Sequence, residues 1–112
     1  MAASHIATLT LGIVAAAAIT QNQAVTAAGA VATAAGNAVG FANTAAASGE
    51  RMPVTAGGTA IAIASAAISV GAAVEVAAAG KVVTKSAGIA VGRALTAAAA
   101  DGDLIEVLLI PN

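Results

Sequence analysis

The sequence predicts an all-β protein, a small β-barrel or β-sandwich built from short antiparallel strands. Glycines recur along the 112-residue chain at about the 8- to 12-residue spacing of short strands joined by turns. The bulkier side chains are mostly Val, Ile and Thr, which favour strands. No segment has the charged face that a solvated helix needs, since only 8% of the residues are charged.

Alternation of apolar and other residues locates the individual strands. Ile61 and Ile63 share one face of the run TAIAIAS, and Val74 and Val76 lie opposite Glu75 in AAVEVAA. Glycine-rich turns separate these runs from their neighbours. The expected strands cover residues 8–17, 24–28, 31–35, 38–42, 53–55, 59–64, 73–78, 81–84, 88–93 and 103–110.

The end of the chain contains the longest bulky run and the one helix candidate. Residues 103–110, DLIEVLLI, are mostly apolar on both faces, so this strand should be central or covered by a neighbour. Pro111 should end it, because proline cannot donate to the ladder. Residues 94–100 are alanine-rich and precede the stop signal Asp101-Gly102, so a short helix is expected there, with a loop turn as the alternative.

Length and composition indicate one domain that gains burial from partners. We divide the chain into an N-terminal arm, residues 1–10, and a single β-rich domain, residues 11–112. Apolar residues make up 60%, but about a third of the chain is alanine and Phe41 is the single aromatic residue. Alanine buries little surface, and a domain of this size is marginal on burial alone. We therefore expect part of the surface to be buried against other subunits. Alternatively, the Ala/Thr/Gly-rich residues 20–48 become ordered only on binding.

Composition also argues against several classes of protein. Without cysteine there is no disulfide, thiolate metal site or cysteine nucleophile. A net charge of -1 without Trp or Tyr argues against nucleic-acid binding. The mean hydropathy of +0.98 suggests a membrane segment, but the uncharged residues 52–74 include Pro53 and several glycines and serines, so we expect no span. The N-terminus lacks the positive region of a secretory signal.

The few polar side chains do not suggest a chemical site, and we expect no catalytic, cofactor-binding or metal-binding residue. His5 has no carboxylate nearby in the sequence and is expected to be an exposed tail residue. Asp101, Asp103 and Glu106 form the one acidic cluster, which we interpret as a turn rather than a calcium site. With a single peripheral histidine, no Ser–His–Asp set is expected, and the chain is predicted not to be an enzyme.

The remaining charges are assigned to loops and edges. Glu50-Arg51 should form a polar loop tip before a strand. Lys81 and Lys85 flank a short strand, where lysines discourage unwanted pairing. Arg93 interrupts an apolar face, so it should pair with an acidic residue or mark an interface.

The order of segments in the second half resembles a known family. The stretch GKVVTKSAGIAVGRALTAAAADGDLIEVLLIP has a glycine-led strand, a VGRAL segment, a run of small residues, an acidic-glycine turn and an apolar IEVLL strand. Upstream, a glycine turn, GERMPV and an ISVGAAV hairpin follow in order. Over residues 20–110 the chain resembles the decoration, or cement, proteins of tailed-phage capsids.

The resemblance implies a structural protein that binds the major capsid protein on the outer surface of the phage head. It implies homo-oligomers, commonly trimers, and no cofactor. We expect residues 1–10 to contact the shell, so that deleting them reduces binding without unfolding the domain. The alternatives are a small membrane-active Ala/Gly-rich protein and an ice-binding protein, although the threonines are irregularly spaced for the latter.

Overall fold

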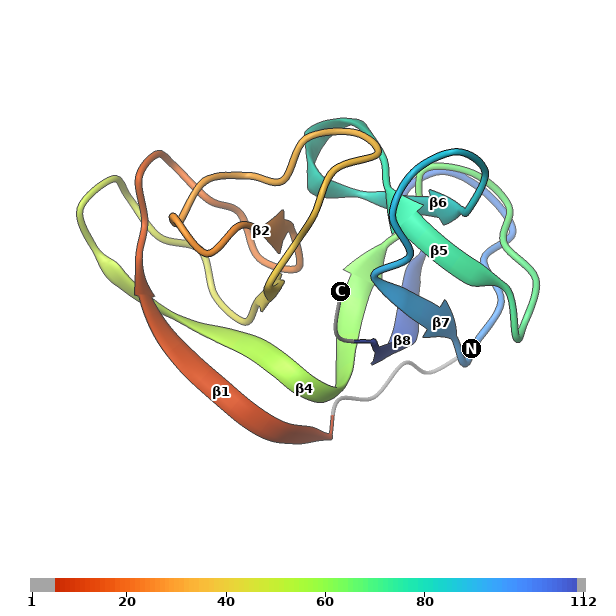
Figure 1. Ribbon diagram of the computed structural model, residues 1–112, viewed down its shortest axis with the longest axis horizontal. Helices are drawn as coiled ribbons and strands as arrows, with labels where there is room; N and C mark the ends of the chain where they lie inside the picture. The colour runs from red at the N-terminus through yellow and green to blue at the C-terminus, as the bar shows by residue number, and fades with distance from the viewer. Residues whose placement is uncertain (1–5, 111–112) are drawn as a thin grey trace.

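The protein is all-β, as the sequence predicts, in a computed structural model that describes residues 6–110 (Figure 1). A short 3₁₀ turn, η1 (Ala78–Gly80), is the one helical element among these residues. The strands are β1 (Ala7–Val14), β2 (Ala24–Val25), β3 (Gly40–Ala42), β4 (Arg51–Ile63), β5 (Ala73–Val76), β6 (Val82–Thr84), β7 (Gly92–Ala94) and β8 (Leu104–Leu109).

The strands form one antiparallel sheet that curls into a nearly closed barrel. The strand order is β2-β3-β4-β8-β7-β5-β6, and β1 pairs with β4 beside this path. A parallel bridge between Ala64 and Val82 brings the chain after β4 against β6, and the Ser65 N–H donates to the Val82 carbonyl at 2.8 Å. These contacts close β4, β8, β7, β5 and β6 into the barrel, while β1, β2 and β3 extend from the first half of β4 (Figure 1).

The long strand β4 corrects the expectation of two strands at residues 53–55 and 59–64. The chain does not turn at Gly57-Gly58 but continues, with register shifts in the facing part of β1. Gly58 has a φ of +81°, and a Cβ on it would lie 2.2 Å from the Ile6 carbonyl oxygen. Glycine is required here because two backbones approach closely, which sequence spacing alone does not distinguish from a turn.

Two other expected elements are absent from the structure. Residues 95–100 form a loop, the alternative given above, and no helix, because their N–H groups find partners elsewhere: Leu95 donates to the Glu106 carbonyl and Ala98 to the Ile68 carbonyl. Tertiary pairing thus outweighs the helix propensity of alanine. Residues 31–35 form no strand beyond an isolated bridge from Val31 to Val25. The expected strand at residues 88–93 begins later, as β7 at Gly92.

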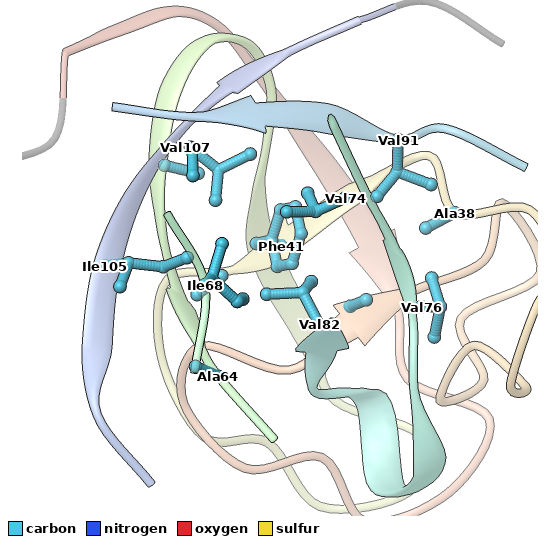
Figure 2. Packing of buried hydrophobic residues seen from close by; sticks show 14 of the residues in the cluster. Ala38, Phe41, Ala64, Ile68, Val74, Val76, Val82, Val91, Ile105 and Val107 are labelled. Atoms are coloured by element: carbon cyan, nitrogen blue, oxygen red, sulfur yellow. The ribbon is translucent and has the colours of Figure 1, made fainter. Parts of the chain in front are cut away.

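The core divides into two clusters on either side of the β2–β3 ribbon. Ala24 and Phe41 belong to the barrel cluster, whereas the adjacent Val25 and Ala42 belong to the second cluster. Figure 2 shows the Phe41 ring at the centre of the barrel cluster, among Val74, Val82, Ile68, Val107 and Ile105. The second cluster consists of Ala15, Ile19, Val25, Ala42, Ala46, Met52 and Val54.

The boundaries of the arm and domain remain predictions. Residues 1–5, and with them His5, lie outside the described residues, as does Pro111. Residues 7–10 of the expected arm lie in β1, which pairs with β4. Residues 20–48 contribute β2, β3 and buried side chains such as Phe41 to the fold.

Candidate assembly surface

The second half of strand β4 has an unusual alternation, because its alanines face the barrel interior and its isoleucines face outward. Ala60 and Ala62 are buried, whereas Ile61 and Ile63 between and after them are only partly covered. Phe41 and the valine and isoleucine side chains of the barrel cluster already fill the interior, so only small side chains of β4 fit against them. The isoleucines therefore lie on the outer surface.

Strand β8 continues this outer apolar surface. Ile63 pairs with Leu104, Ile61 with Glu106 and Thr59 with Leu108, while the buried Ile105 and Val107 alternate with them. On the other side of β8, the Leu95 N–H donates to the Glu106 carbonyl at 2.8 Å, so Leu95 lies beside Glu106. We call this surface the β8 face. It comprises Ile61, Ile63, Leu95, Leu104 and Leu108, with Glu106 at its centre and Arg93 at one end.

The β8 face is exposed although β8 is a central strand. Leu104 is 50% exposed, Leu108 42% and Leu95 40%. Large aliphatic side chains are usually inside, and several exposed ones grouped on one surface indicate an interaction surface. The prediction that this strand is central is confirmed, since β8 pairs with β4 and β7. Within residues 6–110, Ile6 covers the Thr59 end of its outer face, and Leu104, Leu95 and Leu108 remain substantially exposed.

The acidic cluster forms a turn, as interpreted from the sequence. Asp103 Oδ2 accepts the N–H groups of Ala99 and Ala100 at 2.8 and 3.2 Å. Lys81 Nζ and Asp101 Oδ1 are 2.9 Å apart and form the one ion pair of the described chain. The Glu106 N–H donates to Thr96 Oγ1 at 3.0 Å. No group of three potential metal ligands occurs between residues 6 and 110.

The other charged side chains bind backbone groups of neighbouring segments. Arg93 Nη1 donates to the Gly71 carbonyl at 2.6 Å rather than to a carboxylate. Glu50 Oε1 accepts the Ala47 N–H at 2.7 Å. Lys85 Nζ donates to the Ser86 carbonyl at 3.2 Å. These contacts fix loops and strand ends.

Glu75 has a structural role that sequence reasoning did not anticipate. It is 7% exposed, and its Oε1 accepts the N–H groups of Ser86 and Gly88 at 2.6 and 3.0 Å. These two hydrogen bonds, helped by nearby Lys85, lower the pKa of Glu75 below its ordinary value of 4.5, against the opposing effect of burial. The carboxylate thereby holds residues 86–88 over β5. A Ser-Ala-Gly turn after Lys85 was the available signal, but nothing in the sequence places it beside residue 75.

The β8 face was only partly visible in the sequence. The apolar character of both sides of residues 103–110 was recognisable, as was the shared side of Ile61 and Ile63. Alternation does not reveal which side faces the interior, because that depends on where Phe41 enters. The contribution of Leu95 depends on its pairing with Glu106 in place of the expected helix.

Comparison with known proteins identifies the family. Among residues 6–110 there is no helix of the length and apolarity needed for a membrane crossing. No curated protein matches the sequence significantly. A family model described as phage cement protein matches residues 3–109. With almost its whole length matched, the chain belongs to the phage cement protein family.

Proposed function

We propose that this protein binds the outer surface of a phage head as a homotrimer and stabilises the shell without catalysis. Membership of the family gives the chain a structural role in the phage capsid. The observation that carries the proposal further is the β8 face, whose leucines are 40–50% exposed although β8 is a central strand. We assign this face to the contacts made in the assembled particle.

The physical basis is preferential binding to the assembled state. A protein that binds the completed lattice and not its free subunits stabilises the lattice by mass action. Three copies joined in a trimer repeat a weak contact, and the joint affinity greatly exceeds that of one contact. A chain with few charges and a leucine-rich surface is suited to such contacts, because desolvating it has a small polar cost.

Replacement of Leu108 by aspartate tests the β8 face. Leu108→Asp places a charge on this face. It should weaken either trimer formation or binding to purified heads that lack the protein, by about tenfold or more. Pelleting with heads measures the first effect and analytical ultracentrifugation the second. Ile89→Asp is the matched control, because Ile89 is 39% exposed but lies in the loop before β7.

Two outcomes would contradict the proposal. If the wild-type protein remains a monomer and does not pellet with heads, the proposed binding to the head surface is wrong. If the Leu108→Asp variant assembles and binds heads as the wild type does, the β8 face is not part of the contact. Circular dichroism should show the same β-sheet spectrum for both variants, so that loss of binding is not loss of fold.

A further inference from the structure

Strand β1 has one edge that no other strand covers. It pairs with β4 from Ala7 to Val14, and within residues 6–110 no second strand adjoins it (Figure 1). Its sequence, ATLTLGIV, contains no charged residue and no proline. Proteins usually protect edge strands with lysines, prolines or covering loops, because an unprotected edge recruits another strand. Here the side chains of β1 provide no such protection.

The position of Pro53 shows which backbone groups face this edge. Gly12 lies opposite Pro53, which has no N–H and whose carbonyl accepts the Asn43 N–H at 2.9 Å on the side of β3. Thr10 lies opposite Thr55. The Thr55 carbonyl also faces β3, because a Cβ added to Gly40 of β3 would lie 2.1 Å from the Thr55 carbonyl oxygen. Antiparallel pairs alternate between bonded and non-bonded positions. The N–H and carbonyl groups of Thr10 and Gly12 therefore point away from β4.

The side chain of Arg51 hydrogen-bonds to one of these outward-facing backbone groups. Its Nη1 donates to the Gly12 carbonyl at 2.9 Å, and its aliphatic part lies over Gly12. The N–H and carbonyl of Thr10 and the N–H of Gly12 remain for a strand laid alongside.

An apolar hollow of about 500 Å³ borders the same strand. Leu9 and Leu11 of β1 form one wall, and no charged residue lines it. Phe41, Val91, Leu109 and Ala56 of β4 are also part of the lining. When a peptide adds to a sheet edge, main-chain hydrogen bonds supply affinity, and pockets for alternate side chains supply specificity. The edge and the hollow together have both features.

We propose that the free edge of β1 pairs with an extended, uncharged strand of the major capsid protein, with one apolar side chain of that strand in the hollow. The inference rests on the proposed function, which supplies the shell as partner. An uncharged strand is favoured because β1 and the lining carry no charge, while the Arg51 guanidinium beside the edge is bound to the Gly12 carbonyl. A second copy of β1 fits less well, since symmetric pairing of two β1 strands makes a closed dimer rather than a trimer.

A proline at position 10 tests the edge. Thr10→Pro removes an N–H that does not bind β4, so it should leave the fold intact and weaken binding to purified heads by about tenfold, the effect of losing an edge hydrogen bond and its neighbours. Thr10→Val is the matched control, because it retains the N–H and should bind as the wild type does.

A second variant tests the hollow independently of the backbone. Ala56→Leu should fill part of the hollow and weaken head binding with Thr10 unchanged. If Thr10→Pro does not fold, head binding by Ala56→Leu still tests the proposed pairing. Hydrogen exchange gives a third measurement, since the Thr10 and Gly12 amides should become protected when the protein binds heads.

The outcomes separate this inference from the proposed function. If the wild type binds heads and the folded Thr10→Pro and Ala56→Leu variants bind them equally well, the edge pairing alone is refuted. Failure of the wild type to bind heads refutes the proposed function. If Thr10→Pro instead changes the sedimentation of the free protein, the edge pairs with a second copy and the inference is overturned.

Discussion

Glu75 connects a single ionisable group to the stability of a loop. Its carboxylate accepts two backbone N–H groups, and its pKa is lowered from 4.5. A group with a lowered pKa in the folded state stabilises the fold above its unfolded pKa and loses that contribution as the pH falls through its folded pKa. Part of the stability of the protein should therefore disappear in acid, below pH 4.5.

The Glu75→Gln variant isolates this effect. The amide keeps one acceptor oxygen but does not ionise, so the variant should be less stable than the wild type at pH 7 and should approach it at acidic pH. Urea denaturation at both pH values measures the difference. A constant difference between the two proteins would show that the charge of Glu75 does not contribute.

Gly58 provides a second prediction for a single residue. Alanine at this position would bring a methyl group against the Ile6 carbonyl, in addition to the strain of a φ of +81°. Gly102→Ala is the control, because Gly102 has a φ of +92° and no atom lies within 4 Å of the place that its new methyl group would take. We expect a loss of about 1 kcal/mol for Gly102→Ala and of about 2–4 kcal/mol for Gly58→Ala, from urea midpoints. Equal losses would show that close backbone approach is unimportant.

At the scale of the element, the two sides of β8 should respond differently to truncation. Ile105 is fully buried in the barrel cluster, whereas Leu108 is 42% exposed. In the free protein, Ile105→Ala should cost about 2–5 kcal/mol of unfolding free energy and Leu108→Ala less than about 1 kcal/mol. Thermal or urea unfolding of the two variants measures this. A large loss for Leu108→Ala would mean that the β8 face contributes to the fold of the subunit itself.

The elements also show how far sequence carries. The runs around Ile61, Val74 and residues 103–110 were predictable, because β-branched alternation is a local signal. The continuity of β4 through Gly57-Gly58 was not, because it depends on the approach of Ile6 from another part of the chain. Residues 94–100 illustrate the same limit, since the backbone groups that bind them belong to Ile68 and Glu106, outside the local sequence that predicts a helix. Of the assembly surface, its apolar residues were visible but its orientation was not.

At the scale of the whole molecule, the two core clusters should unfold together. β4 contributes Met52 and Val54 to the second cluster and Ala60 and Ala62 to the barrel cluster. Met52→Ala should therefore lower hydrogen-exchange protection in β8 as well as in β4. Leu104→Ala, at an exposed position, serves as control and should change protection little. Protection of β8 that is unaffected by Met52→Ala would show two independent units.

The unbroken course of β4 has a mechanical consequence. Its first half is held by β1 and β3 and its second half by β8, so a pull on β1 passes along β4 into the barrel. Tension parallel to paired strands has to rupture several hydrogen bonds at once, whereas peeling breaks them one after another. Shear along either half of β4 should therefore meet more resistance than a force that peels its partner strands away.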